Sequence, residues 1–486
     1  MPAPETREPE TSDSEPETSD ISGRIRTWVR RHARGPVSLG VNLSLTAVSV
    51  ALAYFYRLRC FGPIYDPSNG ATSGDVAARW FGQGCYTDFQ LLWTGRQLFT
   101  DVVPYLNGGF APDGTALPGT LEYPALSGFL AWAVALPATT DAQFYTFFAI
   151  VLGLCAMGIT TLLVQLAGWR TLWWSLAPGV VLYATYNVEM FVVFFATAAI
   201  WAAVRAEIGS RHAIRWLILC GTLLGLGACA KLYPLLFAAP IALWALLPTA
   251  RLLERSVWRQ LQWKRLMAVI IPTLAVIAIV NVPLMIVHFD GWFAGIKFQW
   301  SRDIDSSTNA IWYWGLRPYI DSPHVQVVLR SVVSAATLIG ILIPPGWGFV
   351  RWYRGGSFPW MQASAAMLMA YLVLNKVHSP QYVLWLIPFF VLLRIRWTWI
   401  IAYYIADVFV GVGFFARGAV GTYDVELSVW PQIFILGVWG RAILLFVLFF
   451  IAMNSPRATD AFIDVRADRR TAPPSRVPAR SAPQLE

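Results

Sequence analysis

A single carboxylate, Asp88, stands in the polar stretch Tyr86-Thr87-Asp88-Phe89, which follows the first long apolar run of the chain. A carboxylate held just outside a lipid-buried region can act as a general base or as an ion ligand. Asp88 can instead cap a helix, because Thr87 and Asp88 precede an apolar-periodic run and both residue types favour helix N-termini. Residue chemistry alone favours the cap, and both interpretations stay open at this point.

A lone lysine, Lys231, lies between two apolar runs in the segment Ala230-Lys231-Leu232-Tyr233-Pro234. Its amine can hold a phosphate as a compact point charge. The alternative is a lysine that extends to the lipid headgroups, which is the more common role at the end of an apolar run. Phosphate binding and anchoring at the lipid headgroups are therefore both possible roles for Lys231.

A third polar turn, Asn375-Lys376-Val377-His378-Ser379-Pro380-Gln381-Tyr382, gathers hydrogen-bond donors between two further apolar runs. Together with Lys231 and Arg96, Lys376 could surround a phosphate. His378 could donate a hydrogen bond to a leaving phosphate oxygen or position an acceptor. A structural histidine with satisfied hydrogen bonds is the alternative.

Other acidic residues give weaker signals. Asp303 and Asp305 form a pair that could hold a divalent metal, although a solvated loop with ordinary charges is the favoured interpretation. Asn187 and Glu189 lie at another turn, and a carboxylate at membrane depth needs a partner that the sequence does not name. The chain has no Gly-rich phosphate loop, zinc-spaced Cys/His set or GxSxG turn, so cytosolic nucleotide chemistry has no visible site.

The elements that must position these residues are membrane helices. The chain has 486 residues, of which 56% are hydrophobic and 13% charged, and its mean hydropathy is +0.52. Apolar runs of roughly 17–25 residues, long enough to cross a bilayer, recur from about Val37 to Ser455. We therefore predict an all-α polytopic membrane protein with a transmembrane domain over 37–454 and disordered cytoplasmic tails over 1–36 and 455–486.

The net charge of +9 reflects basic residues in short loops between the apolar runs. Such residues set the orientation of a membrane protein, so the charge does not indicate nucleic-acid binding, and each cluster is predicted to be cytoplasmic. The clusters are Arg24, Arg26, Arg30, Arg31 and Arg34; Arg205, Arg211 and Arg215; Arg251, Arg255, Arg259, Lys264 and Arg265; Arg351 and Arg354; Arg394 and Arg396.

This orientation predicts about twelve spans, an uncleaved signal anchor and both termini inside. The charge rule is obeyed only if one apolar run does not cross, and 124–137 is short enough to be a re-entrant or interfacial helix. The loop 57–123 then becomes the longest outer feature, and its apolar residues predict interfacial helices. Cys60 and Cys85 share this loop, where they could form a disulfide or be two unrelated thiols.

The order of these segments resembles the GT-C glycosyltransferases, and specifically glycosyltransferase family 87, the polyprenyl-phosphate-mannose-dependent α-mannosyltransferases of actinobacterial type. The resemblance covers roughly 40–453 and lies in Tyr86-Thr87-Asp88-Phe89, Pro104-Tyr105, Glu122-Tyr123-Pro124, Lys231-Leu232-Tyr233-Pro234 and His378-Ser379-Pro380-Gln381-Tyr382.

The resemblance implies an inverting transfer of a sugar, most simply mannose, from a polyprenyl-phosphate donor to an envelope glycolipid or polysaccharide. It places the site on the extracytoplasmic side of the cytoplasmic membrane, with no cofactor and no metal. Asp88 and His378 become the expected catalytic residues, with Asp88 as the base. The expected substrate-binding residues are Arg96, Glu122, Tyr123, Lys231, Tyr233, Lys376, Gln381 and Tyr382.

Three alternatives remain on the sequence alone. The donor could be polyprenyl-phosphate-arabinose, which would make the protein an arabinofuranosyltransferase. A lipid or polysaccharide transporter would also have many spans, although no internal repeat is visible. A non-catalytic scaffold for envelope assembly would tolerate the loss of Asp88.

Overall fold

The computed structural model describes residues 35–61, 65–68, 70–72, 79–80, 83–248, 257–320, 322–419 and 429–460. Most of the two predicted tails and the basic residues Arg251 and Arg255 lie outside the described residues. Residues at the start of the predicted C-terminal tail are packed: Leu393 and Arg457 form an isolated β-bridge, and Arg394 N–H donates to the Pro456 carbonyl at 2.8 Å.

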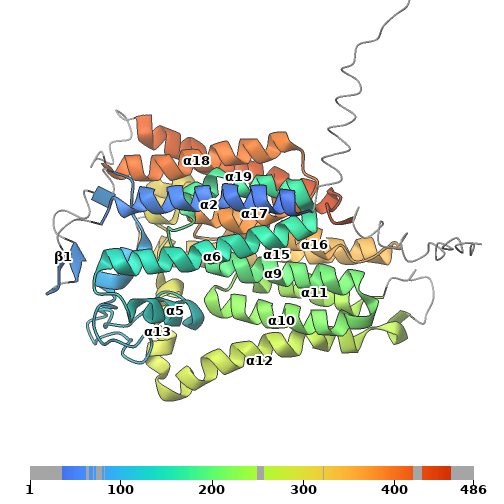
Figure 1. Cartoon of the computed structure of the whole chain (residues 1–486), viewed down its shortest axis with the longest axis horizontal. Helices are drawn as coiled ribbons and strands as arrows, with labels where there is room; N and C mark the ends of the chain where they lie inside the picture. Colours follow the sequence, from blue (N-terminus) through green and yellow to red (C-terminus); the bar gives the residue numbers. More distant parts are fainter. Residues whose placement is uncertain are drawn as a thin grey trace, which may run out of the picture.

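The described chain is built from helices that run side by side along the long axis of the molecule (Figure 1). Eight helical runs are long and apolar enough to cross a membrane, and the predicted class of an all-α polytopic membrane protein is confirmed. They are α2 (Pro36–Leu58), Asp141–Ser175, which joins α6 (Asp141–Ala167), η2 (Gly168–Thr171) and α7 (Leu172–Ser175), then α9 (Glu189–Ile208), α10 (Ala213–Ala230), α12 (Trp263–Val287), α15 (Pro323–Tyr353), α18 (Trp397–Ala419) and α19 (Val429–Asn454).

Four shorter apolar segments complete the bundle. They are α5 (Ala125–Ala135), α11 (Leu235–Leu246), α16 (Trp360–Leu374), and η7 (Pro380–Tyr382) continued by α17 (Val383–Leu392). The expected number of about twelve spans is reached only if short segments are counted with the eight long helices. Helices this short need neighbouring protein rather than lipid around their ends.

The remaining elements are small. They are α4 (Asp88–Gln90), η1 (Leu91–Gly95), α8 (Pro178–Tyr183), η3 (Ser210–His212), η4 (Val257–Gln260), α13 (Phe289–Ser301), η5 (Ser306–Thr308), α14 (Ile311–Leu316) and η6 (Arg317–Tyr319), with strands β1 (Tyr65–Asp66) and β2 (Ala71–Thr72). The two strands pair antiparallel, with Tyr65 opposite Thr72 and Asp66 opposite Ala71.

Lipid-facing and protein-facing helices differ in their exposed residues. On α12, Ile271, Ile279 and Ile286 are 59%, 73% and 79% exposed, a surface that lipid covers better than water. By contrast, every residue of α17 is buried, and this helix packs against α6, α9 and α16. A helix that is apolar all round belongs in the centre of a bundle, so α17 is the internal support for the polar turn before it.

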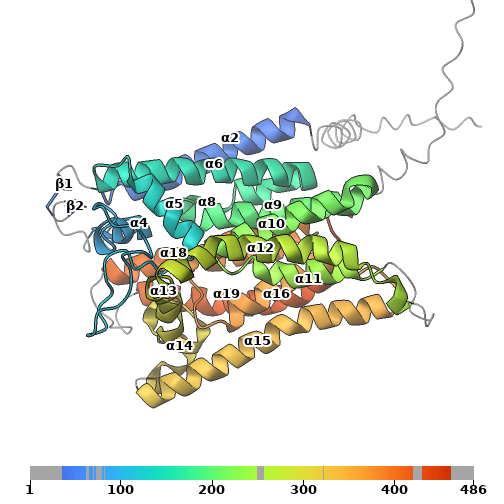
Figure 2. The same cartoon turned by 90° about the horizontal axis from the view of Figure 1, so that it is seen from below.

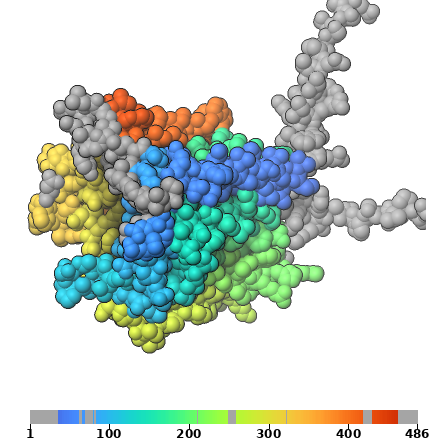
Figure 3. All heavy atoms as spheres, turned by 60° about the vertical axis from the view of Figure 1, so that its left-hand side comes forward, coloured from blue at the N-terminus to red at the C-terminus, as the bar shows by residue number. Residues whose placement is uncertain are grey.

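The two ends of the bundle are distinct. One end carries α4, α13, α14, β1 and β2 (Figure 2), and we call it the Asp88 end. At the opposite end, the Arg205 end, α9 finishes and α10 begins. The segment between α2 and α6, coloured blue to cyan, covers much of the surface of the Asp88 end in Figure 3.

Helix α5 lies within the Asp88 end. Its 11 residues span about 16 Å at 1.5 Å per residue, which is too short for a hydrocarbon core of about 30 Å. The Ser127 hydroxyl in its first turn donates to the Ala230 carbonyl at the end of α10 (2.8 Å). The run 124–137 thus contains a short helix that contacts the end of α10, and its re-entrant or interfacial placement stays a prediction.

Within the loop 57–123, for which interfacial helices were predicted, the segment 86–99 packs into the protein instead. Its helical part is α4 and η1, and Phe89 within it is fully buried. The Phe89 ring lies 4.2 Å from that of Phe148 on α6. Its apolar residues therefore anchor the loop to the bundle, because α6 offers an aromatic surface against which α4 packs.

Candidate active site

Asp88 is the first residue of α4, but it does not cap the helix. The Thr87 hydroxyl accepts a hydrogen bond from Phe89 N–H at 3.4 Å and is the N-cap. The half-buried Asp88 carboxylate accepts instead from the Tyr123 hydroxyl at 2.6 Å and from the Asn187 side-chain amide at 3.3 Å, both at Oδ2. The carboxylate is therefore oriented by two side chains that are distant in sequence.

A buried arginine fixes the chain just before Asp88. Arg57, in the last turn of α2, donates to the carbonyls of Gly84 (2.9 Å), Tyr86 (2.8 Å) and Leu182 (2.6 Å). Charge-assisted hydrogen bonds of this kind are stronger than neutral ones. The sequence indicated only a basic residue at the end of an apolar run, so this role could not be recognised from it.

A disulfide between Cys60 and Cys85 holds the same segment. It decides the choice that the sequence left open in favour of a covalent link. Backbone hydrogen bonds add to it: Asp88 N–H donates to the Tyr186 carbonyl at 3.1 Å, and the Thr87 hydroxyl donates to the same oxygen at 2.9 Å. The chain around Asp88 is thereby held against the segment before α9.

Tyr105 fixes the position of Tyr123. Its hydroxyl donates to the carbonyls of Tyr123 (2.9 Å) and Pro124 (3.0 Å). Tyr105 is buried and has a φ of +66°, a conformation that costs free energy for a residue with a side chain. At Gly128 an added Cβ would lie 1.9 Å from the Tyr105 oxygen, so this approach requires glycine.

Arg96 and Glu122 form an ion pair beside Tyr123. Their side chains are 22% and 38% exposed, so the pair borders on solvent. Both were predicted to bind substrate, and the structure places them next to Tyr123, which donates a hydrogen bond to Asp88. The guanidinium already has a carboxylate, so a phosphate at this position would compete with Glu122.

The Glu189 carboxylate has partners that the sequence did not identify. Its carboxylate is fully buried at the start of α9, pairs with Lys231, and accepts from the Trp385 indole N–H at 2.5 Å. Lys231 lies at the end of α10, and Trp385 lies on the buried helix α17. Three helices thus meet at one carboxylate, and Trp385, which the sequence did not indicate, is part of the cluster.

Three aromatic rings stack beside this ion pair. The Trp385 ring lies 4.1 Å from that of Tyr233 and 3.9 Å from that of Tyr382. The Lys231 ammonium lies 4.7 Å from the Tyr382 centroid and 5.2 Å from the Trp385 centroid. Cation–π attraction and the Glu189 carboxylate together hold the ammonium in place.

The charges of the cluster influence each other. Burial, then the Asp88 and Glu122 carboxylates, raises the pKa of Tyr123 well above its ordinary value, so its hydroxyl stays a donor to Asp88. Burial lowers the pKa of Lys231, but the Glu189 carboxylate and neighbouring groups, including Asp88, outweigh it, and the net shift is upward. Asp88, Tyr123, Glu189 and Lys231 therefore form one electrostatic unit.

His378 and Gln381 are buried in the turn before α17. The His378 carbonyl accepts from Arg441 at 3.0 Å, and Arg441 pairs with Asp407 at 3.2 Å. Burial and the Arg441 charge lower the pKa of His378 well below 6.5. Among the described residues, His378 Nε2, Gln381 Oε1 and the Tyr233 hydroxyl have no hydrogen-bond partner.

Lys376 lies apart from this cluster. Its ammonium donates to the carbonyls of Gln299 (2.8 Å), Trp300 (3.2 Å) and Arg302 (3.0 Å), at the end of α13. These contacts satisfy carbonyls that a helix end leaves without partners. The charge of Asp88 therefore acts on Lys231, whereas Lys376 contacts the end of α13.

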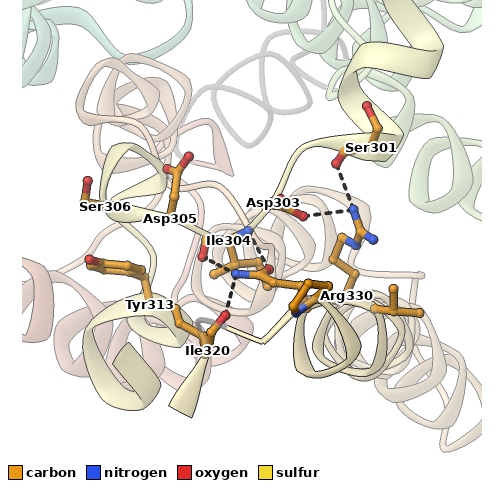
Figure 4. Close-up of a pocket in the computed structure, with 11 residues that line it drawn as sticks. Ser301, Asp303, Ile304, Asp305, Ser306, Tyr313, Ile320 and Arg330 are labelled. Atoms are coloured by element: carbon orange, nitrogen blue, oxygen red, sulfur yellow. Dashed lines mark hydrogen bonds and ion pairs between the residues drawn. The ribbon is translucent and has the colours of Figure 1, made fainter. Parts of the chain in front are cut away.

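Asp303 and Asp305 also face different partners. They border an open cavity of about 750 Å³ between the end of α13, α14 and α15 (Figure 4). Asp303 pairs with Arg330 at 3.1 Å, whereas Asp305 accepts from Ser307 N–H at 2.8 Å as the cap of η5. Both carboxylates have ordinary structural roles, in agreement with the interpretation of a solvated loop.

Fold and site together define a multi-pass, all-helical membrane protein with a buried carboxylate–lysine cluster at one end. No protein-family model matches the sequence, and no curated protein matches it.

Two solved structures are similar to this chain. One is ArnT from Cupriavidus metallidurans bound to undecaprenyl phosphate, with 12% identity, a TM-score of 0.35, and coverage of 84% of this chain and 76% of ArnT. The other is the archaeal oligosaccharyltransferase AglB from Archaeoglobus fulgidus, in complex with an inhibitory peptide and a dolichol-phosphate. It shows 12% identity and a TM-score of 0.36, with coverage of 92% of this chain and 59% of AglB. A similarity at this level establishes neither a family nor an activity.

Proposed function

We propose that the protein is an integral membrane glycosyltransferase that transfers a sugar from a polyprenyl-phosphate donor to a cell-envelope glycolipid or polysaccharide. The observation that carries this proposal is the Asp88 carboxylate, which is half-buried, oriented by Tyr123 and Asn187, and not used as a helix cap. The order of motifs resembling glycosyltransferase family 87 adds support, and it is the basis for mannose as the sugar.

In this proposal Asp88 is the general base. The acceptor hydroxyl gives its proton to the carboxylate while its oxygen forms a bond to C1 of the sugar. The bond between C1 and the phosphate oxygen breaks on the opposite face, and the polyprenyl phosphate leaves with the electron pair. The configuration at C1 inverts, and no nucleotide or metal takes part.

Lys231 is the best-placed cation for the donor phosphate. Its ammonium has three N–H donors, of which Glu189 occupies one in the structure. Its raised pKa keeps it charged at neutral pH. The donor phosphate would share this lysine with Glu189, while Arg96 and Lys376 remain predicted phosphate contacts whose present partners are protein groups.

Buried polar atoms without partners also support a ligand site. Within the described part of the chain, the Tyr233 hydroxyl and Gln381 Oε1 lack hydrogen bonds, and buried groups of this kind are nearly always satisfied in a complete complex. Both belong to the segments that carry the Tyr233–Trp385–Tyr382 stack. Sugar hydroxyls would supply the missing partners, and His378 Nε2 would position the acceptor.

The proposed location is the extracytoplasmic side of the cytoplasmic membrane. The Cys60–Cys85 disulfide lies at the Asp88 end, and disulfides persist in oxidising compartments. The basic residues Arg205, Arg211 and Arg215 lie at the opposite end, as the positive-inside rule expects of a cytoplasmic face.

The decisive experiment is sugar transfer by purified protein in nanodiscs. The donor is radiolabelled polyprenyl-phosphate-mannose and the acceptor an actinobacterial lipid extract. Asp88→Asn should lower the transfer rate by about 10²–10⁴-fold, because an amide cannot take the proton. Folding should be retained, since Asn can still accept from Tyr123. Asp113→Asn, the same change in an exposed residue of the same loop, is the matched control and should keep full activity.

Equal transfer by Asp88→Asn and Asp113→Asn would exclude Asp88 as the base while leaving the activity in place. If the unaltered protein transfers no mannose, polyprenyl-phosphate-arabinose is the second donor to supply. Failure with both donors, in protein that remains folded, would reject the glycosyltransferase proposal.

A further inference from the structure

A second cavity lies at the Arg205 end, where α9 passes through η3 into α10. Its volume is about 480 Å³, and three basic side chains, Arg205, His212 and Arg215, border it together with Trp216 and Leu219. None of the described residues that line it is acidic. A cavity with this lining is complementary to an anion of small size.

The Arg205 guanidinium is held by aromatic rings rather than by a carboxylate. It lies 5.5 Å from the Trp201 centroid and 5.3 Å from the Trp216 centroid, and the two rings pack edge to face at 5.2 Å. An arginine placed over rings keeps its N–H edge available for a planar or tetrahedral oxyanion. Arg205 is therefore oriented before any ligand arrives.

The nearby acidic residue does not neutralise Arg205. Glu207, two positions along α9, accepts two hydrogen bonds from Arg457 Nη1, at 3.0 and 2.8 Å. Within the described residues, no ion pair involves Arg205 or Arg215. Their charge is thus directed to the cavity and to solvent.

The cavity continues into an apolar surface on α10. Ile214, Ile218 and Leu219 are 41%, 45% and 37% exposed, and α10 is one of the eight helices able to cross a membrane. Exposed aliphatic residues on such a helix face acyl chains. A molecule with a phosphate and an acyl chain would therefore match both parts of the site.

We propose that this cavity binds the phosphate group of an anionic membrane lipid. Arg205 and Arg215 contact the phosphate oxygens, His212 lies at the rim, and the acyl chains run along Leu219 and Ile218. Basic residues that only set orientation need no common cavity, whereas these three converge on one. The site is at the other end of the bundle from Asp88 and is independent of the proposed sugar transfer.

The test is lipid retention by full-length protein, measured by native mass spectrometry after titration in detergent. The probes are phosphatidylglycerol, phosphatidylcholine with the same acyl chains, and inorganic phosphate. The unaltered protein should retain phosphatidylglycerol in preference to phosphatidylcholine. Arg205→Gln combined with Arg215→Gln should weaken phosphatidylglycerol binding about thirty-fold, from two lost cationic contacts.

Arg354→Gln is the matched control, because Arg354 is an exposed arginine that follows α15 at the same end of the bundle. It should bind phosphatidylglycerol like the unaltered protein. His212→Glu gives a second test if the double variant does not fold, since His212 is exposed and its replacement by a carboxylate should repel the phosphate.

Three outcomes would overturn the proposal. Phosphatidylglycerol binding that is equal in the double variant and in Arg354→Gln excludes the cavity as its site. Unchanged binding in His212→Glu does the same where the double variant is unfolded. If inorganic phosphate in excess displaces the lipid and itself stabilises the protein, the cavity takes free phosphate and the lipid assignment is wrong.

Discussion

Lys231 is a partly buried lysine whose charge already has a partner. Glu189 is fully buried and receives both the Lys231 ammonium and the Trp385 indole N–H. Removing one member of a buried ion pair costs about 3–5 kcal/mol, because the other charge is left without a partner. A phosphate that binds here must therefore join the pair rather than replace Glu189, which differs from the isolated point charge that the sequence suggested.

His378 gives a prediction of pH dependence. Burial and Arg441 lower its pKa well below 6.5, so the folded protein keeps this imidazole neutral while the unfolded chain takes up a proton. The stability from His378 is therefore present above pH 6.5 and decreases as the pH falls below it. The unfolding free energy should therefore decrease as the pH falls below 6.5, because the unfolded chain takes up a proton that the folded protein does not.

Unfolding midpoints at neutral and acidic pH check this expectation. His378→Gln should lower stability at neutral pH and show a smaller decrease on acidification than the unaltered protein. The same acid sensitivity in both proteins would mean that His378 is not held neutral by its surroundings.

Helix α13 depends on a lysine from a distant turn. Lys376 donates to three carbonyls at the C-terminal end of α13, where cations also interact favourably with the helix dipole. Lys376→Met should lower the free energy of local opening at 299–302 by about 2 kcal/mol. Hydrogen exchange at these amides, followed by mass spectrometry, should become correspondingly faster.

Lys297→Met is the control for this prediction. Lys297 is on the same helix, but its ammonium lies over the Phe110 ring at 5.1 Å and not at the helix end. Its loss should leave exchange at 299–302 unchanged. If Lys376→Met leaves exchange unchanged and weakens donor binding instead, Lys376 serves the phosphate and not the helix.

The sequence predicted elements better than it predicted contacts. Apolar runs identify the long helices because lipid burial requires about 20 apolar residues in a row. The sequence also located Asp88, Tyr123 and Lys231 at the turns between these runs. It could not indicate Arg57 or Trp385, because an arginine at a helix end and a tryptophan in an apolar run are ordinary features of membrane helices.

The structure of the loops was harder to predict than that of the long helices. The apolar pattern near Asp88 suggested a helix at the membrane surface, but periodicity does not say whether the apolar side meets lipid or protein. In the structure the apolar side meets protein, because Phe89 packs on Phe148 of α6. Similarly, Lys376 and Lys231 occupy equivalent turns in sequence, and only the packing of α13 separates their roles.

At the scale of the whole molecule, the two ends differ in how their basic residues are satisfied. At the Asp88 end, Arg96, Lys231 and Arg330 pair with carboxylates. At the other end, Arg457 pairs with Glu207 and Asp460, whereas Arg205 and Arg215 have no such pair among the described residues. The positive-inside rule counts Lys and Arg residues, so the cluster of Arg205, Arg211 and Arg215 favours a cytoplasmic Arg205 end.

This asymmetry predicts that the Asp88 end faces outward. Asp113→Cys and Arg211→Cys place a thiol at an exposed position on each end. A membrane-impermeant maleimide applied to spheroplasts should label Asp113→Cys and leave Arg211→Cys unlabelled, and inside-out vesicles should give the reverse. The unaltered protein is the control, because its free cysteines, Cys155, Cys220 and Cys229, lie within helices and its other two form a disulfide.

Labelling of Arg211→Cys from the outside would show that the orientation is the inverse of the predicted one. Asp88 would then face the cytoplasm, against the proposed extracytoplasmic location of the site.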